Sequence, residues 1–256
     1  MAVAAKSPRV PWKVETMRLT AFTLTADQAD PDMWWDSVVG SPPESKLVKM
    51  KGASQMFEGI IDSRKLVLNV EVNRVDWVIA PNIGPDEDLK DVPNVGAFED
   101  VSKSFEEMSL RWLAMERPIQ RLAWGATLLL PVADRKAGYH TLGKYLPSVK
   151  LDPDTSADFL YQINRWKKSS VIPDLIVNVL QKWSVMKIQR IVAQIPSTGG
   201  GIMGAVTGEG FDACRIELDI NSAPDYQGSF NADQAKALYF EFAGYGAAVA
   251  AKGELG

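Results

Sequence analysis

The sequence contains a single cysteine and a single histidine among its 256 residues, and these two shortages limit its chemistry. One cysteine, Cys214, excludes a disulfide within the chain and fits a reducing compartment. Its place in an alternating apolar stretch predicts a buried structural thiol. A zinc site of cysteine and histidine is excluded in practice, and no partner for catalysis accompanies His140 in the sequence. We therefore expect no cofactor, no bound metal and no catalytic residue, and the sequence favours a protein that is not an enzyme.

Long apolar runs and an excess of basic charge are also lacking. No run approaches the roughly 20 apolar residues that a membrane-spanning helix needs, and the N-terminal segment lacks the apolar core of a signal peptide. The formal net charge is −4, whereas a nucleic-acid-binding domain usually carries a basic footprint. We predict a soluble cytoplasmic protein without a membrane partner, and the charge disfavours nucleic acid as a partner.

The most informative feature of the sequence is a similarity between its two halves. A β-rich run at 17–25 precedes a helix start at Asp30-Pro31, and a similar run at 120–130 precedes a helix start at Asp134. Farther on, Leu66–Val70 is matched by Leu175–Val179. We predict an α+β fold built by internal duplication of a β-α-β-β-α unit. Its mainly antiparallel sheet would carry the helices on one face, with a pseudo-two-fold relation between the units.

The predicted organisation has three parts. Residues 1–15 form an N-terminal extension, residues 16–116 the first repeat, and residues 118–252 the second repeat with an extra strand and a glycine-rich loop at 197–210. Capping residues and apolar periodicity predict the helices, and alternation of apolar residues predicts the strands. The expected helices span 30–40, 98–115, 134–143 and 231–253; the expected strands include 17–25, 55–62, 65–72, 121–130, 157–166, 174–195 and 213–221.

Two features suggest contact with a protein partner. Trp34 and Trp35 are adjacent on a short predicted helix, so their side chains point about 100° apart. A single apolar face of the helix can therefore hardly bury both rings against the core. We expect one ring to be exposed at an interface, where tryptophan is enriched. The loop that contains Gly199, Gly200 and Gly201 has no phosphate-loop lysine and precedes a strand. We expect it to be a flexible loop that orders when a partner binds.

The segment 164–168 is basic and aromatic, and we expect it at the tip of a hairpin. Arg165, Lys167 and Lys168 could contact phosphates while Trp166 stacks on a base. The alternative interpretation is a solvated turn.

Acidic residues lie in predicted strands and allow a third kind of site. Glu217 and Asp219 share one face by strand parity, and Asp76 lies in another strand. A cluster of carboxylates could bind a divalent metal. The alternative interpretation is a solvated sheet face.

These observations favour a non-catalytic binding or assembly subunit that acts through protein–protein contacts. We expect it in an intracellular complex of bacterial or phage type, with a protein partner or a second copy of itself. The duplicated strand–helix–strand outline with a late glycine-rich loop is similar to the tandem ferredoxin-like RNA-processing proteins of CRISPR systems. That resemblance implies the alternative, a single-stranded nucleic-acid-binding or RNA-processing protein. The third hypothesis is a metal-dependent hydrolase that uses acidic residues.

Overall fold

The computed structural model describes residues 10–23, 30–49, 54–84, 90–115, 117–194 and 203–255, and only the backbone of residues 190–194 and 203–209. These residues form nine strands and four helices. The strands are β1 (Lys13–Thr23), β2 (Ser45–Lys49), β3 (Ser54–Ile61), β4 (Arg64–Glu71), β5 (Arg74–Pro81), β6 (Ile119–Val132), β7 (Leu160–Lys168), β8 (Ile176–Gln194) and β9 (Met203–Ser222). The helices are α1 (Pro31–Val39), α2 (Phe98–Leu113), α3 (Arg135–Tyr145) and α4 (Ala232–Lys252).

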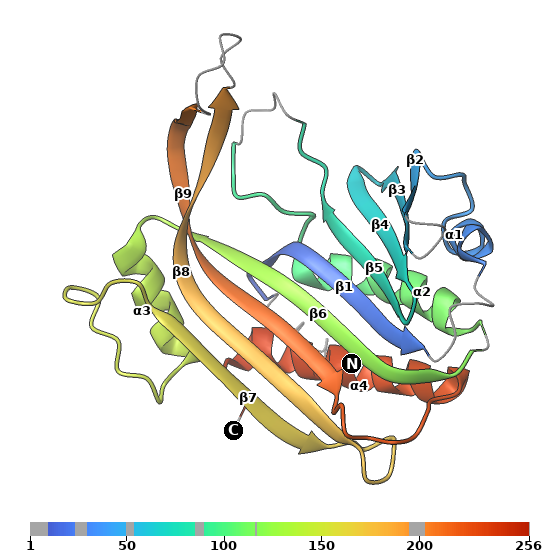
Figure 1. Cartoon of the computed structure of the whole chain (residues 1–256). Helices are drawn as coiled ribbons and strands as arrows, with labels where there is room; N and C mark the ends of the chain where they lie inside the picture. The colour runs from blue at the N-terminus through green and yellow to red at the C-terminus, as the bar shows by residue number, and fades with distance from the viewer. Residues whose placement is uncertain are drawn as a thin grey trace, which may run out of the picture.

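All nine strands join one antiparallel sheet with the order β2-β3-β4-β5-β1-β6-β9-β8-β7 (Figure 1). The pair β1–β6 lies at its centre and joins the two halves of the chain. Outward from this pair the order is β5, β4, β3, β2 on one side and β9, β8, β7 on the other. The predicted mixture of helices with an antiparallel sheet is therefore confirmed.

Two finer predictions about the architecture are not met. A duplicated β-α-β-β-α unit is not shown, because four strands separate α1 from α2 and three separate α3 from α4. The helices are also not all on one face. The long helices α2 and α4 cross behind the central strands, whereas the short helices α1 and α3 lie at opposite flanks (Figure 1).

The N-terminal segment is part of the fold from residue 10 onward. β1 begins at Lys13, inside the range expected to be an extension. Trp12 is buried and its indole Nε1 donates a hydrogen bond to the Ala250 carbonyl at 3.0 Å. Its ring also contacts Tyr145 and Trp183 edge-on. These contacts attach the first strand to the second half of the chain.

Local signals in the sequence fix the ends of the helices. The Asp30 side chain accepts from the Met33 amide, and Asn231 forms a capping box with Gln234. The αL backbone of Gly40 ends α1. The helices expected from these residues are confirmed.

Of the two strands that flank the glycine-rich segment, β8 follows the prediction and β9 is longer than expected. β8 runs without interruption to Gln194, as the absence of glycine and proline predicted. β9 begins at Met203, so residues 203–210 are strand where a loop was expected.

The core lies between the sheet and helices α2 and α4. Alternate residues of β1, among them Met17 and Leu19, are fully buried in it. Seven of the eight tryptophans are buried, and the eighth, Trp166, is 77% exposed. None of the helices in the described ranges has the length and apolar content that crossing a bilayer requires.

Candidate functional site

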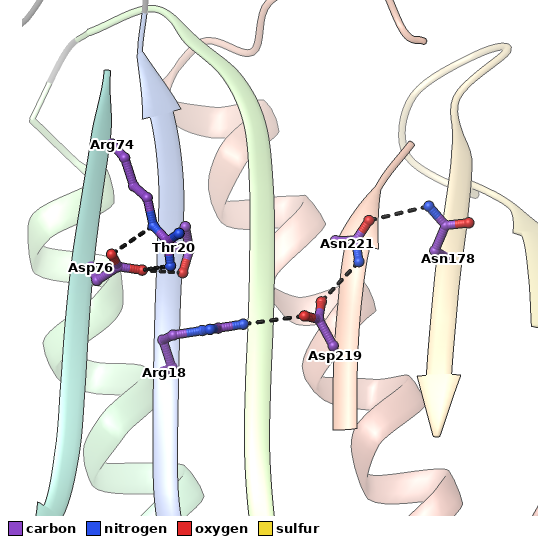
Figure 2. Close-up of polar contacts among 7 residues, drawn as sticks. All are labelled: Arg18, Thr20, Arg74, Asp76, Asn178, Asp219 and Asn221. Carbon is purple, nitrogen blue, oxygen red and sulfur yellow. Dashed lines mark hydrogen bonds and ion pairs between the residues drawn. The ribbon is translucent and has the colours of Figure 1, made fainter. Parts of the chain in front are cut away.

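The face of the sheet turned away from α2 and α4 carries polar side chains, and we call it the open face. In Figure 2 its side chains lie in front of the strands and the helices lie behind them. The strands β5, β1, β6, β9 and β8 contribute to it. Its defining residues are Asp76, Arg18, Thr20, Gly125, Asp219, Asn221 and Asn178.

Arg18 bridges two strands across the middle of the sheet. It is in register with Gly125 of β6, which is in register with Asp219 of β9. The guanidinium Nη2 reaches over β6 and donates to the Asp219 carboxylate at 3.2 Å (Figure 2). A Cβ atom at position 125 would lie 3.4 Å from that Nη2 and 3.2 Å from the Leu218 carbonyl oxygen. Glycine at this position therefore lets the arginine lie flat on the sheet.

A ladder of amides continues from this ion pair toward the edge of the sheet. Asn221 donates to Asp219 at 2.8 Å, and Asn178 donates to Asn221 at 3.1 Å (Figure 2). Asn164 of β7 then donates to Asn178 at 3.0 Å. Arg18 is thus connected through three amides to the outermost strand. Such chains of hydrogen bonds polarise and orient their members.

A second polar group lies on β5 and β1. The Arg74 guanidinium donates to both Asp76 oxygens at 2.7 and 3.0 Å, and the Thr20 hydroxyl donates to Asp76 at 2.5 Å (Figure 2). The hydrogen bond to Asp76 is the main cause that raises the pKa of Arg74. The Phe22 ring lies beneath two guanidinium groups, 5.7 Å from Arg74 and 5.0 Å from Arg121. This end of the open face is held by charge pairing and by cation–π contacts.

A hollow of about 520 Å³ lies on the open face between these groups and β7. It is lined by charged residues of both signs. Lys182 pairs with Glu217 at 2.9 Å, and Arg215, beside the hollow, pairs with Glu15 at 3.0 Å and also with Glu217. The charged side chains in and beside the hollow are therefore paired with opposite charges on the same face of the sheet. Its lining is Thr16, Arg18, Val78, Gly125, Ala126, Thr127, Gln162, Leu180, Lys182, Glu217, Leu218 and Asp219.

The residues predicted to form a basic and aromatic hairpin tip lie within strand β7, and their side chains point to two opposite sides of that strand. β7 extends to Lys168, and its side chains alternate. Trp166 and Lys168 lie on the side of Asn164, which bonds to the open face. Arg165 lies on the other side, where it forms an ion pair with Glu254, and Lys167 shares that side by alternation. The expectation that these four residues act together at a hairpin tip is wrong, because successive residues of a strand point in opposite directions.

The expected exposure of Trp34 or Trp35 is also wrong. The two residues are 6% and 1% exposed. Trp34 contacts the ring of Trp112 edge-on at 5.8 Å, while Trp35 stacks on Trp77 at 6.1 Å. Helix α1 lies in a corner between α2 and the strands, so two sides of the helix are covered.

The other partner-binding residues expected from the sequence, Gly199, Gly200 and Gly201, lie outside the described residues.

The acidic residues do not gather as a metal site. The described ranges contain no group of three or more His, Cys, Asp or Glu side chains that could hold a metal ion. Asp76, Glu217 and Asp219 each face a cation instead. Each of these carboxylates is therefore neutralised by a cationic side chain of the protein.

The cysteine and the histidine lie away from the open face. Cys214 is fully buried, and its thiol donates to the Gly138 carbonyl at 3.4 Å. Burial raises the pKa of this thiol to about 12, so it is protonated at neutral pH. His140 is exposed on α3. The burial of Cys214 agrees with the structural thiol that the alternating apolar residues predicted.

Comparison of the chain with protein-family models, with curated proteins and with solved structures finds no match.

Sequence reasoning missed Arg18, Gly125 and the amide ladder. One signal was present: Arg18 and Thr20 alternate with Met17, Leu19 and Ala21 in a single run. That alternation places both polar residues on one face of a strand. The partners of Arg18 could not be read in the same way, because they depend on the register between strands far apart in the sequence.

Proposed function

We propose that the protein is a non-catalytic binding subunit that holds a protein partner against the open face of its sheet. The observation that carries this proposal is Trp166. Its ring is 77% exposed at the margin of the open face, although the other tryptophans are all buried. Exposed tryptophan and arginine side chains supply much of the binding energy at protein interfaces. Arg18 is connected through the amide ladder to Asn164 of β7, and Trp166 lies on the same side of that strand as Asn164.

The charge pattern of the open face supports a protein as the partner. Arg18 and Asp219 have 35% and 39% of their side chains exposed, so water still reaches the pair. Positive and negative groups alternate across the hollow, which suits a partner surface with mixed charges and many hydrogen-bonding groups. A strongly anionic partner would meet two carboxylates, Glu217 and Asp219, beside the two cations that line the hollow.

An affinity capture with variants on two faces tests the proposal. The tagged protein is incubated with extract that has been treated with nuclease, and the recovered proteins are quantified. We expect Trp166→Ala and Arg18→Ala to lose proteins that the wild type recovers. The matched control is Phe240→Ala, an exposed aromatic residue of α4 on the opposite side of the sheet. Equal recovery with all four proteins, each shown to be folded by circular dichroism, would contradict the proposal.

One observation favours a second candidate, a single-stranded nucleic-acid binder. Trp166 and Lys168 lie on the same side of β7, so a base could stack on the ring while a phosphate meets the ammonium group. Affinity should then fall with salt with a slope of about −0.7 per phosphate contact. Fluorescence anisotropy with labelled single-stranded RNA and DNA at low and physiological salt measures this. Tight, salt-sensitive binding that Trp166→Ala and Lys168→Ala abolish would replace the protein partner with nucleic acid.

We also infer that the two half-sheets share an origin. Three features support this inference. The strand order matches on the two sides of β1–β6, and a helix follows the first and the last strand of each half. Leu66–Val70 lies in β4, and its counterpart Leu175–Val179 covers the start of β8. Relatives whose two halves resemble each other more closely would strengthen the inference. Relatives in which the two halves differ in strand order would contradict it.

A further inference from the structure

The two edges of the sheet are built differently. β2 also exposes two apolar side chains, Leu47 and Val48, but it has only five residues, and its Lys46 is paired with Asp32 of α1 at 2.6 Å. Short edge strands with lysine resist pairing with other chains. β7 has nine residues, and two large apolar side chains on it, Leu160 and Trp166, are 58% and 77% exposed. In the described part of the chain no strand pairs with the outer side of β7. This edge therefore presents unpaired backbone groups beside exposed apolar surface, which is the template for strand addition.

We propose that β7 pairs with β7 of a second copy of this chain, antiparallel about a two-fold axis at Asn164. The two nine-stranded sheets then become one continuous sheet, and the open faces of both copies lie side by side. The inference concerns the backbone edge of β7 and does not require that the open face binds a protein partner.

The distribution of charge along β7 selects this arrangement. The strand has three cations, Arg165, Lys167 and Lys168, and no acidic residue, and all three cations lie after its midpoint. Antiparallel pairing about Asn164 separates the cationic ends of the two copies. Parallel pairing would bring them together, and like charges on paired strands are destabilising. In this arrangement both copies use the same strand about a two-fold axis, so the contact is isologous. Such a contact leaves no further β7 edge to pair and gives a dimer, not a filament.

The register about Asn164 brings together side chains that suit one another. Trp166 lies opposite Gln162 of the second copy, so the exposed ring packs on the aliphatic part of an amide side chain. Lys168 lies opposite Leu160. On the other side Arg165, already paired with Glu254, lies opposite Ile163. No two cations face each other directly, and cross-strand pairs of this kind stabilise sheets.

The contact is small, so the dimer should be weak. A stable interface buries about 800 Å² on each partner, and one strand pair with its side chains provides less. We expect a dissociation constant between about 1 and 100 μM, as for transient contacts at the small end of the range. The dimer would then form in proportion to the concentration of the protein.

Sedimentation equilibrium of the full chain with complementary charge variants tests the proposal. Asn164→Lys places two ammonium groups opposite each other at the axis, and Asn164→Asp places two carboxylates there. Each variant alone should associate at least about tenfold more weakly than the wild type, while their equimolar mixture should recover a dimer through Lys–Asp pairing. Recovery in the mixture also shows that both variants are folded. The matched control is Val48→Lys on the exposed edge strand β2, which should dimerise like the wild type.

Three results would overturn the proposal: a wild type that is monomeric up to about 500 μM, far above the expected dissociation constant; a dimer that Asn164→Lys leaves unchanged; or a mixture that stays monomeric. Arg18→Ala separates this inference from the proposed function. It should leave the dimer intact while it removes the partner from the open face.

Discussion

The covered face and the open face of the sheet are made by alternate residues of the same strands, yet they hold opposite kinds of side chain. On β1, Met17 and Leu19 are fully buried against the helices, while Arg18 and Thr20 join polar contacts on the other side. The tryptophans follow the same division, since seven lie in the core and Trp166 is exposed. The apolar contacts that stabilise the fold therefore lie on one face of the sheet, and the polar contacts that we propose for recognition lie on the other.

The energies of the two kinds of contact explain why this division is possible. Burying one large apolar side chain contributes about 1.5–3 kcal/mol, whereas an ion pair that water reaches contributes about 0–1 kcal/mol. Removing a side chain from the covered face should therefore unfold the protein more readily than removing one from the open face.

The largest loss of stability should come from a substitution on the covered face. Trp77 is fully buried between Trp35 and Trp112. We expect Trp77→Ala to lower the free energy of unfolding by about 3–5 kcal/mol, because it leaves a cavity in a ring cluster. Denaturant unfolding followed by circular dichroism measures this. A loss below about 1 kcal/mol would mean that the ring cluster does not hold the core, contrary to the burial of Trp77.

An intermediate loss of stability should come from removing Asp76, a deeply buried carboxylate of the open face. Only 8% of the Asp76 side chain is exposed, and it accepts hydrogen bonds from Arg74 and Thr20. We expect Asp76→Ala to cost about 1–3 kcal/mol, because a buried donor loses its partner. The matched variant Glu217→Ala removes a carboxylate that is 34% exposed and should cost about 1 kcal/mol or less. Equal losses for the two variants would contradict the account.

A smaller loss of stability is expected where the Arg18 side chain crosses over β6. Gly125→Ala places a Cβ against the Leu218 carbonyl and the Arg18 guanidinium, and should cost about 1 kcal/mol by crowding. Gly143 of α3 has nothing within 4 Å of an added Cβ, so Gly143→Ala serves as the control. That control should be neutral or stabilising by up to about 1 kcal/mol, because alanine favours a helix. Thermal unfolding of both variants gives the comparison, and a stable Gly125→Ala would show that Arg18 does not need the glycine.

The smallest effect on stability should be that of Trp166→Ala, within about 0.5 kcal/mol, since the ring is exposed. Acrylamide quenching of tryptophan fluorescence provides a second readout. The accessible fraction of the emission should disappear in this variant while the protected fraction remains. A loss of stability above about 1 kcal/mol would place Trp166 in the core and end its role as a binding residue.

Much of the fold could be predicted from local signals. Caps at Asp30, Asp134 and Asn231 located three helices, and alternation located the strands. The burial of Trp34 and Trp35 could not be predicted. We assumed that helix α1 packs on the protein through one side only, whereas it packs against both α2 and the strands. The placement of Arg165 and Trp166 at one hairpin tip was wrong because a turn was assumed where the strand continues, and a strand directs neighbouring residues to opposite faces.

The candidate site was less predictable than the fold. Each of its contacts joins strands from distant parts of the chain, as Arg18 and Asp219 do. Their register depends on how the whole sheet assembles around β1 and β6. A sequence pattern gives the face on which a residue lies, but it does not give the residue that lies opposite.

Site-specific photo-crosslinking tests the central claim most directly. A photoreactive phenylalanine analogue replaces Trp166 in one protein and Phe240 in another, and both are irradiated in cells that express them. We predict that position 166 yields a discrete adduct with a different protein, which is lost when Arg18→Ala is added, while position 240 yields none. An adduct between two copies of this chain, formed through the β7 contact, should persist in Arg18→Ala. Adducts at position 240 alone, or at neither position, would contradict the assignment of recognition to the open face.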